Sequence, residues 1–437
     1  MKLYTRETVE TALVGRHGQV LSAVQSAYML HSTGETSLPF STFLRPAGYP
    51  NDRIIALPAH IGGDFDIAGI KWISSFPENL DRGQQRASSV LILNSLETGY
   101  PTALLESSQI SATRTAASAA LASATLHGSE DHVSTIGIIG CGTINLATID
   151  YLFHVHPQIN EVLSFDLRRE RAHEFSHLVK ASHPEARVRV AKEPDEILAA
   201  SNTIAIATTD SSHWLDLPPW HGPGHQVVLH TSLRDLSVPS ILAAANVVDD
   251  PDHVCREATS LDLATQQTGN RDFITGRIGD LLLGAPLSSS PDSRVIFSPF
   301  GLGILDLGAV GLGEAEPGGV DRGVLPLPAD LRDGMQRRRD GTLEMALSDV
   351  GVGCRHGVCL ARGFLNPATL GIGQGHGWAG RGQHGVSLAV KVRARSRPPA
   401  AGPPALGLPC AGRDALPQGP PRTPSKETGM AQGPVRN

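Results

Sequence analysis

The sequence predicts an α/β protein in which a parallel sheet built from βαβ crossovers is combined with a second, discontinuous α+β unit. Two observations predict the parallel sheet. Apolar segments alternate with helical stretches over residues 133–249, and the first of these segments runs into a Gly-x-Gly turn at Gly140 and Gly142. A third observation predicts the other unit, because residues 53–94 hold short apolar runs separated by Gly and Pro, as sheet strands do.

The elements of the N-terminal part follow from the spacing of apolar residues. Val9, Leu13 and Leu21 belong to a helical series that predicts a helix over residues 5–31, with a stop near Gly34. We expect strands at residues 53–58, 66–73 and 89–94, and an Ala- and Ser-rich helix at residues 107–127.

The next part of the chain alternates between the two kinds of element. The expected segments are 133–139, 145–154, 161–166, 169–181, 186–190, 194–200, 203–207, 226–231, 238–244 and 246–249. Parallel neighbours require such crossovers, so this alternation favours a parallel sheet.

Composition excludes several classes of protein. The 437 residues suffice for two or three domains, and 37 Lys+Arg against 43 Asp+Glu give a net charge of −6. With aromatics at 5%, this charge predicts no nucleic-acid partner. Five widely spaced Cys are typical of a reducing compartment and predict a cytoplasmic protein. No apolar run reaches about 18 residues, so neither a signal peptide nor a membrane span is expected.

The composition changes near residue 308. Residues 308–437 contain 25 Gly and 14 Pro and carry 16 Lys+Arg against 10 Asp+Glu, which predicts a basic, low-complexity, disordered tail. We interpret this composition as that of GC-rich DNA read out of frame, with a basic interaction arm as the alternative. Cys354, His356 and Cys359 match no zinc spacing, so no metal site is predicted.

The strongest local motif is the strand, turn and helix over residues 136–145. Gly140 permits the tight turn, and Gly142 lets the backbone approach a pyrophosphate. The helix that begins at Thr143 and Ile144 would present free N–H groups to that anion. The segment therefore predicts a dinucleotide site.

An acid on the following strand supports this prediction. Asp166 ends the strand about 20 to 26 residues after the turn, where a ribose hydroxyl pair is held in such folds, while Asn145 replaces the usual third glycine. A carboxylate repels a 2′-phosphate, which favours NAD, although Arg168 and Arg169 leave NADP open. A sheet of this kind without nucleotide is the alternative.

Cations in apolar or small-residue settings are the next signal, because a core seldom tolerates them unpaired. Arg53 opens an apolar strand, Lys71 lies inside another, and Arg114 interrupts a small-residue helix. Arg86 is a weaker fourth candidate, and Asp235 follows a strand of the parallel sheet. Each cation could instead form an internal ion pair, and Asp235 could cap the next helix.

Several longer phrases carry a resemblance to a known family. They are Gly69-Ile-Lys71-Trp-Ile, Ser75-Phe-Pro-Glu-Asn79, Leu93-Asn94 with Thr98-Gly99, Ser111-Ala-Thr-Arg114-Thr-Ala-Ala, the turn at Gly140, and Ser298-Pro-Phe-Gly-Leu-Gly303-Ile-Leu-Asp306. With these phrases, residues 1 to about 307 resemble the ornithine cyclodeaminase/mu-crystallin family.

Within that family, the phrases around Arg86, Asp235 and Asp249 are most similar to the branch that supplies 2,3-diaminopropionate for siderophores and peptide antibiotics. The resemblance implies NAD-dependent oxidative cleavage of N-(2-amino-2-carboxyethyl)-L-glutamate. Hydride leaves the glutamyl α-carbon and water attacks the resulting imine. The products would be L-2,3-diaminopropionate, 2-oxoglutarate and NADH.

The resemblance also implies residue roles. Asp235 is expected to be the general base, and Lys71 to hold a substrate carboxylate and assist proton transfer. Arg53, Arg114 and Arg86 would bind the other carboxylates. Cofactor contacts are expected from Gly140, Gly142, Thr143, Ile144, Asn145, Asp166, Thr113, Ser232 and Gly303.

The implied organisation is a homodimer whose residues 1–115 bind substrate and dimerise and whose residues 116–307 form the Rossmann domain, followed by the tail at 308–437. Family members continue beyond the Asp306 position with a helix that returns to the first domain. Here the chain becomes Gly308-Ala-Val-Gly-Leu-Gly, so we expect that helix to be lost. The alternatives are an ornithine cyclodeaminase, which recycles NAD and releases ammonia, an imine reductase or alanine-type dehydrogenase, and a non-catalytic NAD(P)H-binding mu-crystallin-like protein.

Overall fold

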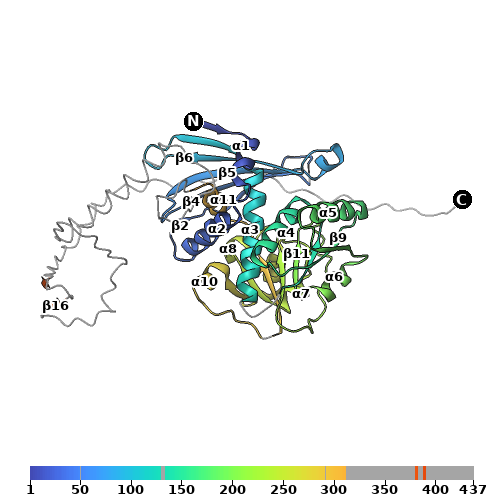
Figure 1. Cartoon of the computed structure of the whole chain (residues 1–437). Coiled ribbons are helices and arrows are strands. Elements are labelled where there is room, and N and C mark those ends of the chain that lie inside the picture. Colours follow the sequence, from blue (N-terminus) through green and yellow to red (C-terminus); the bar gives the residue numbers. More distant parts are fainter. Residues whose placement is uncertain (50, 129–132, 291, 312–378, 382–386, 390–437) are drawn as a thin grey trace, which may run out of the picture. The chain divides into compact units, whose positions relative to one another are not determined.

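The computed structural model describes residues 1–49, 51–128, 133–290, 292–311, 379–381 and 387–389. The chain divides into two units, Met1–Gly353 and Cys354–Asn437. The first unit contains the two large sheets, whose elements are labelled in Figure 1. In the second, β16 (Ala379–Arg381) pairs with β17 (Ser387–Ala389) in antiparallel orientation.

The first sheet has seven strands in the order β1-β7-β6-β5-β4-β2, and β3 also pairs with β4. The strands are β1 (Lys2–Tyr4), β2 (Thr36–Ser37), β3 (Thr42–Leu44), β4 (Arg53–Ile61), β5 (Ile67–Ser75), β6 (Ala87–Asn94) and β7 (Pro101–Glu106). β1 runs parallel to β7, and the other pairs are antiparallel. A 3₁₀ helix, η1 (Pro77–Arg82), lies between β5 and β6.

The register of β4 and β5 brings the predicted cations to one face. Arg53 lies opposite Ser75, and Leu57 lies opposite Lys71. Because side chains alternate along a strand, all four of these residues project from the same face of the sheet. Helices α2 (His17–Ser32) and α11 (Gly303–Val310) contact β4, α11 also contacts β5, and α3 (Ser108–His127) contacts β6.

The helix predicted over residues 5–31 is broken in two. α1 (Arg6–Leu13) and α2 (His17–Ser32) are separated at Gly15, whose φ is +72°. A residue in this left-handed conformation ends a helix, and glycine adopts it without a steric cost. The Thr5 hydroxyl caps α1 by accepting a hydrogen bond from the Thr8 amide. The prediction was therefore right about the helical segments and wrong about their continuity.

The second sheet has eight parallel strands in the order β10-β9-β8-β11-β12-β15-β13-β14. The strands are β8 (Thr135–Ile139), β9 (Glu161–Phe165), β10 (Arg187–Val190), β11 (Thr203–Ile206), β12 (Gln226–His230), β13 (Ala245–Val248), β14 (Ile274–Arg277) and β15 (Arg294–Ser298). Its helices are α4 (Thr143–Val155), α5 (Arg169–Ser182), α6 (Pro194–Ala200), α7 (Val238–Leu242), α8 (Pro251–Val254), α9 (Ser260–Thr268) and α10 (Ile278–Leu282).

The predicted α/β class is confirmed, because the order of strands around β8 is that of a Rossmann sheet. The sequence analysis did not assign β7 or the elements between β13 and α11. Among the described residues, no helix is both long and apolar enough to cross a membrane.

Helix α3 (Ser108–His127) lies between the two sheets. It contacts β6 of the first sheet and β12 and β15 of the second, and it packs on α2 and α4. The domain boundary proposed between residues 115 and 116 falls within this helix, so the two-domain division stays a prediction.

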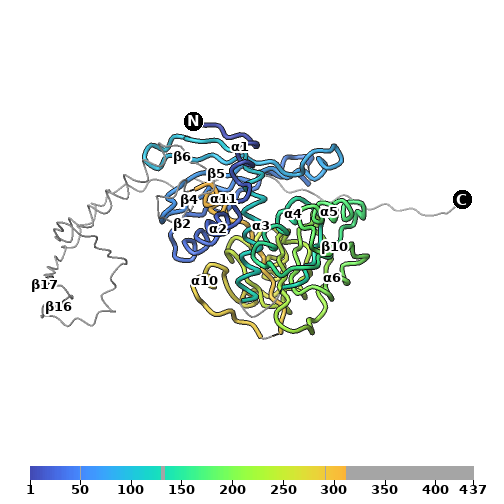
Figure 2. The backbone as a smooth tube through the Cα atoms, viewed as in Figure 1, coloured from blue at the N-terminus to red at the C-terminus, as the bar shows by residue number. Residues whose placement is uncertain are grey.

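Helix α11 (Gly303–Val310) begins before Asp306 and continues four residues beyond it. Loss of the family helix further along the chain stays a prediction, because residues 312–378 lie outside the described residues. All eight residues of α11 are buried, and it contacts α2, α3, β4 and β5. Figure 2 shows this late segment among the N-terminal elements. A Cβ atom at Gly308 would lie 3.4 Å from Ala27, so the small residues let α11 pack close to α2. The tail beyond residue 311, including Cys354, His356 and Cys359, lies outside the described residues except for β16 and β17.

We predict that Leu307→Ala lowers the free energy of unfolding by about 2 to 5 kcal/mol, because a fully buried leucine is replaced by a cavity. Urea denaturation followed by circular dichroism measures this loss. The matched control is Leu178→Ala, whose side chain on α5 is 53% exposed and should cost less than about 0.5 kcal/mol. Equal losses in the two variants would contradict the packing role of α11.

Candidate active site

Three charged side chains from separate elements meet in a buried ion cluster. The Lys71 Nζ atom on β5 donates a hydrogen bond of 2.6 Å to the Asp306 Oδ2 atom on α11. The Arg114 Nε atom on α3 lies 3.3 Å from the same oxygen. The side chains of Lys71, Arg114 and Asp306 are 2%, 8% and 0% exposed. We call these three residues the lysine cluster.

The lysine cluster holds one more positive charge than negative. Burial and the nearby charge of Arg114 lower the pKa of Lys71 to about 8, and Asp306 opposes this shift. The Asp306 Oδ1 atom and the Arg114 Nε atom have no hydrogen-bond partner within the described part of the chain. A buried excess charge is costly, so this arrangement suits an anionic ligand group.

The loop before α11 is built against Arg114. The Asp249 carboxylate accepts hydrogen bonds from the Phe300 amide (2.9 Å) and the Gly301 amide (2.8 Å). Gly301 has φ +91°, and a Cβ atom there would lie 3.0 Å from the Arg114 Nη1 atom. Burial raises the pKa of Asp249, whose backbone partners act against that rise. The loop therefore requires glycine at this position.

The glycine turn has the geometry that the motif predicts. Gly140 has φ +90°, and a Cβ atom there would collide with the Ala207 carbonyl oxygen. Gly142 precedes α4 as its N-cap, and a Cβ atom there would meet nothing closer than 4.0 Å. The free amides of the first turn, at Thr143 and Ile144, therefore border open space.

Asn145 lies behind the turn, in the core. Its Nδ2 atom donates hydrogen bonds to the carbonyl oxygens of Gly140 (2.7 Å) and Ile139 (3.1 Å), and its side chain is fully buried. This amide ties the turn to the sheet, so any effect of Asn145 on a ligand is exerted through the turn backbone.

Asp166 is linked directly to the glycine turn. Its Oδ2 atom accepts a hydrogen bond of 2.9 Å from the Cys141 amide, and its Oδ1 atom accepts one from the Arg168 amide. Burial raises the pKa of the Cys141 thiol to about 12, so this cysteine is no nucleophile at neutral pH. Arg168 pairs with Asp81 of η1 at 3.5 Å, and Arg169 contacts His173.

Asp235 belongs to a second buried cluster. Its carboxylate accepts hydrogen bonds from the hydroxyls of Thr208 and Ser232, and the His230 Nε2 atom lies 3.3 Å from its Oδ2 atom. Burial would raise the pKa of Asp235, but the hydrogen bond and charge of His230 and the two hydroxyl donors lower it overall. The carboxylate is therefore ionised at neutral pH. Within the described residues, this cluster is separate from the lysine cluster.

The remaining candidates take different positions. The Arg86 Nη1 atom donates a hydrogen bond of 2.7 Å to the Ser75 hydroxyl, which lies opposite Arg53 in the sheet. Thr113 lies on α3 beside Arg114, and Gly303 begins α11, where a Cβ atom would lie 3.1 Å from Ala59 of β4.

Sequence reasoning missed three partners of the candidate residues. The sequence analysis assigned no partner to Asp306, although an acid in the otherwise apolar run of residues 304–310 is itself a signal of a buried partner. His230 and Thr208 gave no such signal. Among the described residues, no cluster of three or more His, Cys, Asp or Glu side chains could hold a metal ion.

Known proteins are similar to this chain in sequence and in fold. The chain is 29% identical to N-((2S)-2-amino-2-carboxyethyl)-L-glutamate dehydrogenase of Staphylococcus aureus over 315 residues, which cover 70% of this chain and 92% of that protein. The fold is similar to that of Thermococcus litoralis Delta(1)-pyrroline-2-carboxylate reductase in complex with NADH and L-proline, with a TM-score of 0.64 at 22% identity, over 70% of this chain and 94% of that one.

An archaeal alanine dehydrogenase dimer with bound NAD has the same fold, with a TM-score of 0.61 at 24% identity, over 70% of this chain and 93% of that one. The sequence profile of one family matches residues 2–310, which include both large sheets and α11. By this match, the chain belongs to the ornithine cyclodeaminase/mu-crystallin family.

Proposed function

We propose that the protein is an NAD-dependent oxidoreductase that cleaves N-(2-amino-2-carboxyethyl)-L-glutamate to L-2,3-diaminopropionate and 2-oxoglutarate. One observation carries this proposal: Lys71 and Arg53 project from one face of the first sheet, and Arg114 and Arg86 join them there. A substrate with three carboxylates requires several cations, and one α-carboxylate requires fewer. The name of the Staphylococcus aureus relative supports the same substrate.

The glycine turn fits the cofactor. The open space at Gly142 and the amides of Thr143 and Ile144 suit a pyrophosphate, and Asp166 stands where a ribose diol is bound in such folds. The Asp166 carboxylate accepts hydrogen bonds from two backbone amides, so the ribose hydroxyls would bind to the same carboxylate. When bound, NAD supplies the acceptor for the hydride from the substrate α-carbon. The NADH and NAD in two proteins of the same fold support this assignment.

The residues of the chain would handle binding and protons. Lys71 and Arg114 hold a substrate carboxylate, and Asp306 orients the Lys71 ammonium group. Asp235, ionised by its partners, takes the proton of the secondary amine as hydride leaves and releases this proton to solvent. It then takes a proton from the water that attacks the imine and passes it to the imine nitrogen, which leaves as the amine of diaminopropionate. One substrate, one NAD⁺ and one water become diaminopropionate, 2-oxoglutarate, NADH and a proton. A cytoplasmic location and a role in siderophore or antibiotic biosynthesis stay predictions.

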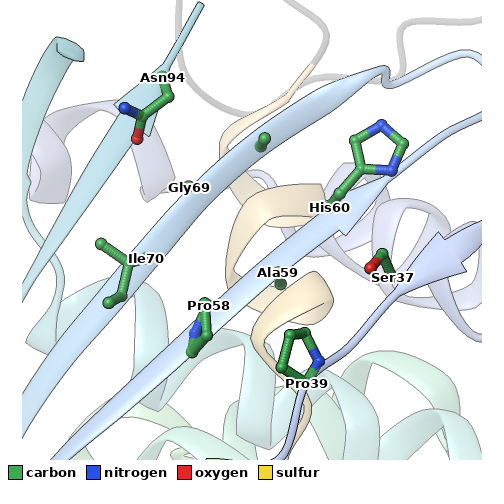
Figure 3. Close-up of a pocket in the computed structure, with 9 residues that line it drawn as sticks. Ser37, Pro39, Pro58, Ala59, His60, Gly69, Ile70 and Asn94 are labelled. Carbon is green, nitrogen blue, oxygen red and sulfur yellow. The ribbon is translucent and has the colours of Figure 1, made fainter. Parts of the chain in front are cut away.

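The homodimer also stays a prediction, and the outer face of the first sheet supports it. Leu104, Ile92, Ile70 and Pro58 form a row across four strands on the face opposite Lys71, and Trp72 on the same face is 43% exposed. Pro58 and Ile70 also line a groove of about 350 Å³ (Figure 3). An apolar sheet face of this kind suits a second copy of the chain.

The function is tested by absorbance of NADH. We expect the purified chain with NAD to release one NADH and one 2-oxoglutarate for each N-(2-amino-2-carboxyethyl)-L-glutamate consumed, and none with L-ornithine. Ammonia and proline from L-ornithine, without net NADH, would instead identify a cyclodeaminase.

The same assay tests the base. Asp235→Asn should lower kcat by about 10²- to 10⁴-fold, because an amide cannot accept the proton, with NADH affinity unchanged. Asp195→Asn, on the exposed surface of α6, is the matched control and should change neither quantity. Loss of NADH affinity together with turnover would rule out the assigned role of Asp235.

We predict that kcat/KM falls as the pH rises through about 8, because only the protonated Lys71 binds a carboxylate. The Asp306 carboxylate raises the pKa of Lys71 and the Arg114 cation lowers it. Asp306→Asn should therefore move the alkaline limb to lower pH, and Arg114→Gln should move it to higher pH. The pH profile of kcat/KM measures both shifts. If the alkaline limb stays in place in both variants while kcat/KM falls equally at every pH, Asp306 and Arg114 have a structural role only.

The dimer prediction is checked by light scattering. We expect a mass of two chains for the wild type and of one chain for Ile70→Lys, because a charge on the outer sheet face opposes burial of that face. Leu178→Lys, on the exposed side of α5, should remain dimeric. A monomeric wild type would contradict the prediction.

A further inference from the structure

Four arginines from different segments converge at the edge of the substrate face. Arg53 begins β4, and Arg86 reaches Ser75, the residue opposite Arg53. Arg45 follows β3, and Arg234 follows β12 of the second sheet, so both large sheets contribute. We call these four residues the arginine cluster. The sequence analysis identified Arg53 and Arg86 and missed Arg45 and Arg234.

The arginine cluster contains more positive charge than its surroundings neutralise. The Glu257 carboxylate pairs with the Arg45 Nη2 atom at 2.5 Å. The Arg234 Nη2 atom donates to the uncharged carbonyl oxygen of Glu257 at 2.7 Å. The Arg53 Nε atom is buried and has no hydrogen-bond partner among the described residues. Among the described residues, Glu257 pairs with only one of the four guanidinium groups, and the charge of Asp235 also acts on Arg234, so two carboxylates face four cations.

The guanidinium groups are close enough to affect one another. Burial lowers the pKa of Arg53 and the charge of Arg45 adds to this, while Glu257 opposes it. Burial followed by the charge of Arg53 lowers the pKa of Arg86. Burial and then the charge of Arg53 also lower the pKa of Arg234. Partly buried like charges repel, so the cluster is less stable without an anion than with one.

The backbone beside the arginine cluster is strained. Leu233, Glu257 and Ala258 have φ angles of +68°, +60° and +53°, which side chains with a Cβ atom adopt at a cost. The strained residues are held by hydrogen bonds from the Ser260 amide to the Leu233 carbonyl and from the Ala258 amide to the Asp262 carboxylate. These hydrogen bonds hold the segments that carry Arg234 and Glu257.

A series of aromatic and backbone contacts connects the arginine cluster to the lysine cluster. The Arg45 guanidinium lies 5.1 Å from the centre of the Phe43 ring, and this ring lies 6.5 Å from that of Phe300. Phe300 precedes Gly301, which packs against Arg114 of the lysine cluster. Lys71 pairs with Leu57, which lies four residues along β4 from Arg53, so the backbone positions of Arg53 and Lys71 are about 13 Å apart along the strand direction. The long side chains of both residues can span part of this distance.

We propose that the arginine cluster binds a second anionic group of the substrate, the carboxylate farthest from the reacting carbon, and that Arg234 and Arg45 thereby select substrates with more than one carboxylate. This inference rests on the proposed function, because it divides one substrate between two clusters. The lysine cluster holds the carboxylate next to the reacting carbon. Guanidinium groups bind carboxylates through paired hydrogen bonds, so the distal group would bind with defined geometry.

The first experiment compares two substrates that differ by one carboxylate. The wild type should prefer N-(2-amino-2-carboxyethyl)-L-glutamate over the corresponding derivative of L-2-aminobutyrate in kcat/KM, and Arg234→Gln and Arg86→Gln should each reduce this preference about 10- to 100-fold. The matched control is Arg187→Gln, whose side chain on β10 is 73% exposed and should leave the preference unchanged. An unchanged preference in the cluster variants overturns the inference and leaves the proposed function intact.

The second experiment needs no turnover. Isothermal titration of the full chain with NADH bound should show that glutarate binds more tightly than its monoamide, and that Arg86→Gln weakens glutarate at least about tenfold without changing NADH affinity. If glutarate binds as expected but the protein turns over no substrate, the proposed function is contradicted and the anion site is supported. Weakened NADH binding with unchanged glutarate binding would assign the cluster to a cofactor phosphate and overturn the inference.

Discussion

The buried ion pair between Lys71 and Asp306 is the interaction on which the candidate site depends. It joins two residues that are 235 positions apart in the chain, one on a central strand of the first sheet and one on the last described helix of the same unit. Neither charge has access to water, and removal of Asp306 would leave the buried cations Lys71 and Arg114 without a compensating charge. The pair thus fixes α11 against β4 and β5 in one register and places Arg114 beside both.

This constraint explains how charge is distributed over the site. Asp306 neutralises only one of the two cations around it, and Glu257 only one of the four arginines at the edge of the same face. The protein therefore maintains an excess of positive charge where the first sheet meets the loops of the second. Asp235 has a different set of partners and is ionised by His230 and two hydroxyls. The arrangement separates anion binding from proton transfer, which is the division of labour that the proposed reaction needs.

The end of the family region coincides with a packing boundary. The family profile matches residues 2–310, and α11 ends at Val310, two residues after the composition of the chain changes. Gly308 is a poor helix former in isolation. In the structure, the same glycine lets α11 approach Ala27 on α2, and the burial of apolar neighbours offsets the low helix propensity. Gly15 has the opposite effect, because it adopts a left-handed conformation and the first helix breaks there.

The sequence by itself determined the local features: the α/β alternation, the Gly140 turn with its following helix, and the presence of cations where apolar residues are expected. These follow from backbone sterics and from the spacing of apolar side chains, which act over a few residues. Only the tertiary structure decided the partners. Spacing along the chain does not reveal that Asp306 neutralises Lys71, that Asn145 ties the turn to the core, or that Arg45 and Arg234 join Arg53. Electrostatic interactions depend on distance and burial in space, and segments from both sheets set these quantities only after the chain has folded.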